Sequence, residues 1–169
     1  PRGKNRRQTM NPSTIQKNFS RFAFQYNQYS EVQQVLFSHV LETLPEWVPS
    51  SILEIGCGTG WGSKRLQARF PDARISAIDF SPEMIEIAKK AAPDIAFQVA
   101  DATTLRPANQ FDLIVSNATF QWVPDLNALF KSVSASLSQG GVFAFSTFGP
   151  ETFKELANVL KDVFGIPSY

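Results

Sequence analysis

The chain has 169 residues, of which 43% are hydrophobic and 18% are charged. This length and composition fit one globular domain with its own core. Sixteen basic residues against 15 acidic ones give a formal net charge of +1, which argues against a general electrostatic grip on nucleic acid. A single cysteine, Cys57, excludes a disulfide within the chain, and no apolar run approaches the ~18 residues that span a bilayer. We therefore expect a cytoplasmic protein without a nucleic-acid or membrane partner.

The one concentrated basic run lies between Arg2 and Arg7. Its neighbours are polar and show no apolar period. Residues 1–12 are therefore interpreted as a disordered or added tail, with Met10 as a candidate native start. An arm that binds nucleic acid is the alternative interpretation.

Apolar periodicity and turn residues predict strands that alternate with helices. The expected elements, in chain order, are a helical segment over 13–44, a strand over 51–55, a helix ending at 66–70, a strand over 74–79, a helix from the cap Ser81 to about Ala91, strands over 95–99 and 111–116, a helix over 126–137, a strand over 142–147 and a helix over 151–164. This alternation predicts an α/β fold with a mostly parallel, Rossmann-like sheet and helices on both faces.

The first helical segment carries an apolar row. Val32, Val35, Leu36, Val40 and Leu44 recur at helical spacing. The row predicts one face of a helix that packs on the core.

The most informative stretch is Glu54-Ile55-Gly56-Cys57-Gly58-Thr59-Gly60, where a buried strand runs directly into three glycines. Glycines let the backbone approach a ligand closely, and the helix start that follows favours anionic or polar groups. Asp79 ends the second strand and follows Gly58 by 21 residues, close to the ~20 expected of an acid that binds ribose. The stretch predicts a cofactor site, and an ordinary tight turn is the alternative.

A nicotinamide dinucleotide is the competing cofactor. Its G-x-G-x-x-G fingerprint requires a third glycine where Trp61 stands, three positions after Gly58. Glu54, before the loop, also suits a ligand with an ammonium group, which S-adenosylmethionine has and NAD lacks.

The run E-I-G-C-G-T-G resembles the first motif of class I S-adenosylmethionine methyltransferases, and the resemblance covers residues 51–148. It implies S-adenosylmethionine as cofactor, S-adenosylhomocysteine as product and no metal. The implied cofactor-binding residues are Glu54 near the methionine amino group, Gly56, Gly58 and Gly60 along the methionine and ribose, Asp79 at the ribose hydroxyls, Met84 against the adenine, Asp101 and Ala102 at the adenine edge, Asn117 and Ala118 at the reacting end, and also Cys57 and Phe80.

Some of these residues have structural alternatives. Met84 also suits a core position, and Asp101 suits a helix cap or turn. Cys57 is interpreted as a small residue packed in the loop rather than a nucleophile. His39, the only histidine, is interpreted as structural or solvated, and one His with one Cys gives no zinc cluster.

The stretch after the fourth strand, Ser116 to Trp122, bears on the methyl acceptor. It lacks the N/D-P-P-Y/F signature of enzymes that methylate amino groups of DNA and protein, and it offers no cysteine where a cytosine-C5 enzyme has its nucleophile. A small or carrier-bound acceptor is therefore favoured.

Three stretches resemble the malonyl-acyl-carrier-protein O-methyltransferases of biotin synthesis. They are N-F-S-R with two tyrosines and a glutamine over 18–33, F-Q-W at 120–122, and T-F-G-P-E-T-F-K-E-L at 147–156. The resemblance implies that the acceptor is the free carboxylate of malonyl-acyl carrier protein or malonyl-CoA. A carboxylate has a reference pKa near ~4 and attacks without a general base, so no catalytic residue is assigned.

Residues 13–50 are expected to form a helical lid, because their aromatic residues and Gln33 are poor choices for a solvated arm. The expected substrate and lid residues are Phe19, Tyr26, Tyr29, Gln33, Trp122 and Phe148. Alternatives are a methyltransferase for another small carboxylic acid or a quinone precursor, and a methyltransferase-like binding subunit without turnover.

Residues 51–169 are expected to form a cofactor-binding α/β domain truncated at its C-terminus, because the family's sheet has two further strands. The apolar edge at Val142–Phe145 would then be unpaired, and such edges invite another chain. We expect self-association through this edge or a longer natural polypeptide, and cofactor binding that outlasts catalysis.

Overall fold

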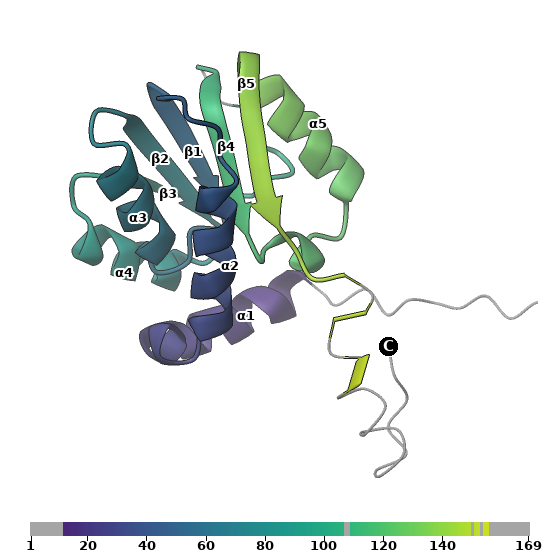
Figure 1. The fold of residues 1–169 in the computed structure, drawn as a ribbon. Helices are drawn as coiled ribbons and strands as arrows, with labels where there is room; N and C mark the ends of the chain where they lie inside the picture. The colour runs from purple at the N-terminus through teal and green to yellow at the C-terminus, as the bar shows by residue number, and fades with distance from the viewer. Residues whose placement is uncertain (1–11, 107–108, 150, 153, 156–169) are drawn as a thin grey trace, which may run out of the picture.

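The computed structural model describes residues 12–106, 109–149, 151–152 and 154–155. Its elements are α1 (Pro12–Phe22), the 3-10 helix η1 (Ala23–Gln28), α2 (Glu31–Glu42), β1 (Ser51–Ile55), α3 (Trp61–Arg69), β2 (Arg74–Asp79), α4 (Pro82–Ala91), β3 (Ala96–Val99), β4 (Phe111–Asn117), the 3-10 helix η2 (Phe120–Trp122), α5 (Leu126–Ser136) and β5 (Leu137–Ser146). Figure 1 shows helices on both faces of a central sheet, with α1 below the ends of the strands. No helix within these ranges is both long and apolar enough to cross a membrane.

The described strands form one parallel sheet in the order β3-β2-β1-β4-β5. The chain runs outward from β1 to β3 and then returns to the other side of β1 with β4, so the strand order reverses between β1 and β4. In open α/β sheets, ligands bind at the carboxyl ends of the strands at such a reversal. The predicted Rossmann-like α/β fold is confirmed.

Two apolar clusters cover the two faces of the sheet. Neighbouring residues of β1 point to opposite faces, so Ile52 belongs to the cluster under α2, α3 and α4, and Leu53 belongs to the cluster under α5. Both side chains are at most 2% exposed. Burial on both faces explains why apolar residues stand at the adjacent positions Ile52 and Leu53 of β1 rather than only at alternate positions.

The apolar row predicted for α2 is wrong at its N-terminal end. Phe37 and Val40 are buried in the core, but Val32 and Val35 are each 57% exposed. At 100° per residue, these two valines lie about half a turn from Phe37, so the row joined two faces of one helix.

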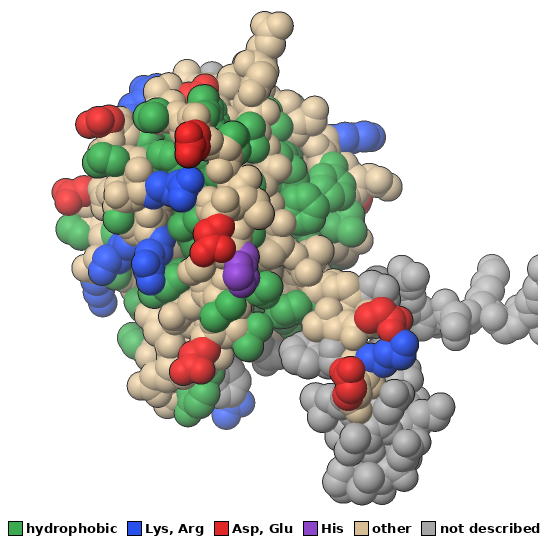
Figure 2. Space-filling model, viewed as in Figure 1, with side chains coloured by type: hydrophobic (Ala, Val, Ile, Leu, Met, Phe, Trp, Pro, Cys, Tyr) green, Lys and Arg blue, Asp and Glu red, His purple; other side chains and the backbone are tan. Residues whose placement is uncertain are grey.

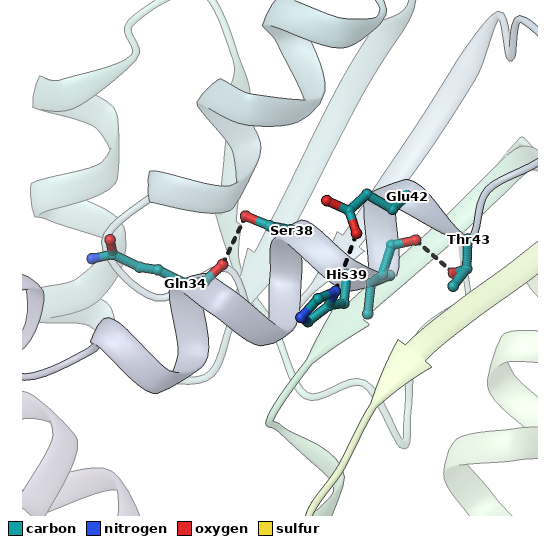
Figure 3. A network of polar contacts seen from close by, with 6 residues as sticks. Gln34, Ser38, His39, Glu42 and Thr43 are labelled. Atoms are coloured by element: carbon teal, nitrogen blue, oxygen red, sulfur yellow. Dashed lines mark hydrogen bonds and ion pairs between the residues drawn. The ribbon is translucent and has the colours of Figure 1, made fainter.

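Ser38, His39 and Glu42 make side-chain contacts within α2 (Figure 3). The Ser38 hydroxyl donates to the Gln34 carbonyl at 3.0 Å, and His39 Nδ1 lies 3.1 Å from Glu42 Oε2. Both members of the His39–Glu42 pair are exposed, and Figure 2 shows the histidine at the surface of the molecule. The histidine therefore takes part in a contact local to α2.

The boundaries of β1, β2 and α4 agree with the sequence prediction. The Ser81 hydroxyl accepts the backbone N–H of Met84 at 3.2 Å and caps α4. In contrast, β5 begins at Leu137 rather than Val142, because the Gly140–Gly141 pair lies inside the strand as an irregularity in its pairing with β4.

Two predicted segments cannot be compared with the fold. The helix predicted over 151–164 and the tail over 1–12 lie almost wholly outside the described residues.

Candidate functional site

A cavity of about 280 Å³ lies at the carboxyl ends of β1, β2 and β4. Predicted site residues that line it are Phe19, Tyr26, Gly56, Gly58, Asp79, Phe80, Met84, Asp101, Ala102, Asn117, Ala118 and Trp122. Lining residues that the sequence analysis did not name are Ile78, Ala100, Thr103, Thr119, Val123, Pro124 and Asp125. Ile78 and Ala100 stand at the ends of predicted strands, directly before Asp79 and Asp101, and this adjacency is the signal in the sequence that indicates them.

The glycine loop is built onto the end of β2. The backbone N–H groups of Gly56 and Cys57 both donate to the Ile78 carbonyl, at 2.8 and 3.0 Å. Gly56 has a φ of +73°, and a Cβ at this position would collide with the Thr119 side chain. The loop after β4 can therefore pack onto the loop after β1 only where the residue lacks a side chain.

Asp79 holds this loop from the end of β2. Its Oδ2 accepts the Gly58 N–H at 2.8 Å, and its Oδ1 accepts the Ser81 N–H at 2.9 Å. Burial raises the pKa of Asp79 from its ordinary value, and the hydrogen bonds from Ser81, Gly58 and Phe80 oppose that rise. A carboxylate has about four lone-pair sites, so Asp79 can still accept a ligand hydroxyl beside these hydrogen bonds.

Glu54 does not line the cavity. It lies beneath the glycine loop, 3% exposed, where it accepts the Ser63 hydroxyl and packs against Gly62 of α3. The pKa of Glu54 is raised to about 8, chiefly by burial and to a smaller extent by the nearby Asp79 charge, with the Ser63 hydrogen bond opposing the rise. Side chains along β1 alternate between the two faces of the sheet, and this alternation directs Glu54 toward α3 rather than toward the cavity.

Cys57 and Gly60 also lie outside the lining. Burial, with Glu54 and Asp79 nearby, raises the pKa of the Cys57 thiol well above its ordinary value, so the thiol is neutral and suits packing. Gly60 has a φ of +81°, and a Cβ there would lie 3.0 Å from the Ala88 Cβ of α4. This glycine serves the contact between α3 and α4.

Three of the expected substrate or lid residues do not line the cavity either. Tyr29 is 79% exposed, and Phe148 follows the end of β5. Gln33 stands behind the wall, where its carbonyl accepts the Asn117 amide at 2.8 Å. The Oε1 atom of Gln33 is buried without a hydrogen-bond partner among the described residues.

The N-terminal segment closes one side of the cavity. The ring of Phe19 packs edge-on against Phe80, at 6.1 Å between centroids, and against Trp122, at 5.5 Å. The Gln16 amide donates to the Phe80 carbonyl at 2.6 Å, and the Ser20 hydroxyl donates to Glu83. Phe19 therefore joins the loop after β2 to the loop after β4 across the cavity.

Backbone strain marks the wall after β4. Ala118 has a φ of +48°, in the left-handed region that favours glycine. Its N–H donates to the Ser146 carbonyl at 3.0 Å, and the Ser146 hydroxyl donates to Asn117 Oδ1 at 2.6 Å. The end of β5 thus holds a costly conformation at the cavity wall, as occurs at functional sites.

The charge of the lining is one-sided. Asp79, Asp101 and Asp125 line the cavity, and no lysine or arginine is among its described lining residues. This arrangement suits a cationic ligand and opposes a pyrophosphate, so it disfavours a dinucleotide. Within the described ranges, no group of three His, Cys, Asp or Glu side chains could hold a metal ion.

A larger groove of about 700 Å³ crosses β1, β2 and β3, on the face of the sheet against which α5 packs. It adjoins the cavity at Ile78, Ala100 and Asp101 but includes no residue of the glycine loop. We therefore place the site in the smaller cavity.

Comparisons with solved structures agree with this fold. The chain aligns with DhpI in complex with S-adenosylhomocysteine at a TM-score of 0.70 and 23% identity, covering 83% of this chain and 71% of that one. It aligns with an S-adenosylmethionine-dependent methyltransferase from Clostridium acetobutylicum at a TM-score of 0.69 and 24% identity, covering 83% and 61%. At these identities, the likeness concerns the fold.

Curated sequences give nearer relatives. Malonyl-[acyl-carrier protein] O-methyltransferase 1 of Ilyobacter polytropus is 42% identical over 154 residues, which are 86% of this chain and 56% of that protein. The malonyl-[acyl-carrier protein] O-methyltransferase of Bacillus anthracis is 40% identical over 153 residues, 87% of this chain and 57% of that protein. The chain thus spans little more than half the length of these relatives.

The amino-acid sequence also matches one protein family, and the glycine loop, the strand order and the position of the cavity agree with that match. Residues 52–141, more than half of the chain, match the family described as "Methyltransferase domain". The chain therefore belongs to the methyltransferase domain family.

Proposed function

We propose that this chain binds S-adenosylmethionine in the cavity and acts as an O-methyltransferase. Its proposed substrate is the free carboxylate of a malonyl thioester on acyl carrier protein, which it esterifies in biotin synthesis. The carrying observation is the identity of about 40% to relatives named for this reaction, along 86–87% of the chain. Malonyl-CoA is the alternative carrier of the same acyl group.

The cavity fits this cofactor. Its acidic lining without lysine or arginine suits a sulfonium cation, and the glycine loop leaves room where side chains would stand. In this proposal Asp79 accepts the ribose hydroxyls, Met84 and Phe80 flank the adenine with Asp101 and Ala102 at its edge, and Asn117 and Ala118 face the reacting end. Glu54 stabilises the methionine ammonium from beneath the loop, with Gly56, Cys57, Gly58 and Gly60 shaping the backbone above it.

When bound, S-adenosylmethionine supplies the methyl group: a carboxylate oxygen bonds to the methyl carbon, the carbon–sulfur bond leaves its electron pair on sulfur, and an ester and a thioether form without proton transfer. The chain therefore has no proton to move. Its residues align the two reactants and exclude water, which is the main catalytic contribution available to such a site.

We further propose that residues 13–50 act as a lid on a cofactor-binding domain formed by 51–169. The support is the position of Phe19 between Phe80 and Trp122, together with the Gln16 and Ser20 hydrogen bonds to the loop and helix after β2.

Calorimetric titration with S-adenosylhomocysteine, followed by a methyl-transfer assay, tests the proposal. The assay compares malonyl-acyl carrier protein, malonyl-CoA, other short carboxylic acids and quinone precursors. Methyl ester formation on the malonyl substrates is the expected result. Cofactor binding with transfer only to another acid or a quinone would overturn the acceptor, and an absence of cofactor binding would overturn the proposal as a whole.

A further inference from the structure

Resting on the proposed function, we infer that the indole N–H of Trp122 is the hydrogen-bond donor that holds the acceptor carboxylate, and that Phe19 positions this indole. A carboxylate must enter a cavity whose described lining has three aspartates and no lysine or arginine. A neutral donor must then supply the contact that orients it.

Most polar side chains on the wall after β3 and β4 already use their donors. The Asn117 amide donates to the Gln33 carbonyl at 2.8 Å, and the Thr119 hydroxyl donates to the Asn117 carbonyl at 3.0 Å. The Thr103 hydroxyl donates to Asp101 Oδ1 at 2.7 Å. These groups are engaged in holding the wall.

Two aromatic lining side chains carry a polar hydrogen, Tyr26 and Trp122. The Tyr26 ring lies over Gly58, and burial and then the Asp79 charge raise the pKa of its hydroxyl. An anionic acceptor at Tyr26 would face that carboxylate. Trp122 ends η2, on the cavity wall that follows Asn117 and Ala118 at the proposed reacting end, so we assign its indole as the donor for the acceptor.

Indole chemistry suits this task. The Nε1–H group donates and cannot accept, so it favours a carboxylate over an ammonium or amine. It also stays neutral, which matters because the negative charge of the acceptor is lost as transfer proceeds. A cationic clamp would stabilise the ground state more than the transition state, whereas a neutral donor orients the carboxylate with a smaller penalty.

Phe19 fixes the direction of the indole. The two rings meet edge to face, at 5.5 Å and 85°, and Phe19 is itself held against Phe80 at 6.1 Å. Closing of the N-terminal segment and alignment of the acceptor are therefore one event in this arrangement.

The test compares the whole chain with Trp122→Phe, which removes the N–H and keeps an aromatic ring, and with Phe19→Leu. Dissociation constants are measured with S-adenosylhomocysteine bound, for malonyl-acyl carrier protein and for its neutral methyl ester. Trp122→Phe should weaken malonyl binding by roughly 10-fold or more, the scale for a hydrogen bond to a charged group, and leave ester binding within about twofold. Phe19→Leu should show the same selective loss to a smaller degree.

In turnover, Trp122→Phe should raise KM by a similar factor and change kcat by less than about threefold, because the removed contact is made about equally in the ground state and the transition state. Trp47→Phe, in the loop before β1 and packed on the core, is the matched control and should leave both constants unchanged. Affinity for S-adenosylhomocysteine and the thermal unfolding midpoint report whether each variant is folded.

Equal loss of malonyl and ester binding in Trp122→Phe would overturn the carboxylate grip and leave the proposed function standing. Unchanged malonyl binding in that variant would do the same. If the unaltered chain binds S-adenosylhomocysteine but neither binds nor methylates malonyl-acyl carrier protein, the proposed acceptor fails and the grip fails with it.

Discussion

The carboxylate of Asp79 accepts the backbone N–H of Gly58 at 2.8 Å, so the end of β2 holds the glycine loop that follows β1. One side chain therefore shapes the loop and also faces the cavity that the loop borders. Loop geometry and ligand binding are coupled through this residue, and a substitution at Asp79 acts on both.

Asp79→Ala should weaken binding of S-adenosylhomocysteine by roughly 1–3 kcal/mol, the scale for losing charged hydrogen bonds. The loop loses its anchor and the ligand loses its acceptor. Isothermal titration calorimetry measures the change, with Asp72→Ala in the exposed turn before β2 as control. Unchanged affinity in Asp79→Ala would remove the ribose assignment.

Glu54→Gln should flatten the pH dependence of the ligand-free chain's stability. The folded-state pKa of about 8 lies above the ordinary value of this carboxyl, so folding favours its protonated form. The contribution of this carboxyl to the free energy of unfolding is fully present below its unfolded-state pKa and is lost as pH rises through about 8. The loss amounts to about 1.4 kcal/mol per pH unit between roughly pH 5 and 8.

The glutamine side chain of that variant stays neutral and can still accept the Ser63 hydroxyl. Urea unfolding from pH 5 to 9 compares the two chains, and the free-energy difference should grow in favour of Glu54→Gln as pH rises. Parallel profiles would show that the Glu54 carboxyl does not titrate in this range.

If residues 13–50 act as a lid, amide hydrogen exchange over residues 19–33 should slow when S-adenosylhomocysteine is added. A filled cavity gives Phe19 and Tyr26 a surface to pack on. Mass spectrometry of peptides from 131–136 of α5, which do not line the cavity, provides the internal control. Equal rates over 19–33 with and without ligand would speak against a lid.

The edge of β5 is expected to take up another chain. This strand ends the described sheet, carries no charged residue, and has Phe145 exposed at 42% beside Phe130 at 41%. Light scattering over a range of concentrations should give a mass above that of one chain, and Phe145→Glu should lower it toward one chain. Lys131→Glu on α5 is the charge control. A chain that is monomeric at every concentration would contradict this prediction.

Sequence patterns were sufficient where the determining contacts are local. The bounds of β1, β2 and α4 follow from apolar runs and from the Ser81 cap, which act over a few residues. The glycine loop and Asp79 were placed together because the ends of neighbouring parallel strands must meet, and the family follows from the same residues.

Local patterns failed where a residue's surroundings come from distant segments. The row on α2 mixed two faces because spacing alone does not show which face meets the sheet, so Val32 and Val35 were misplaced. The strand predicted over 142–147 omits the Gly140–Gly141 pair, because the place of this pair within β5 depends on pairing with β4.

The amino-acid sequence by itself determined the fold class, the order of the elements and the chemistry at the strand ends, because periodicity, caps and glycines constrain the backbone locally. Only the tertiary structure decided that Glu54 lies beneath the loop, that Thr119 packs on Gly56, and that Phe19 meets Trp122 across the cavity. Those contacts join residues far apart in the chain, and they form only when the sheet brings the carboxyl ends of β1, β2 and β4 to one edge and the N-terminal segment closes over them.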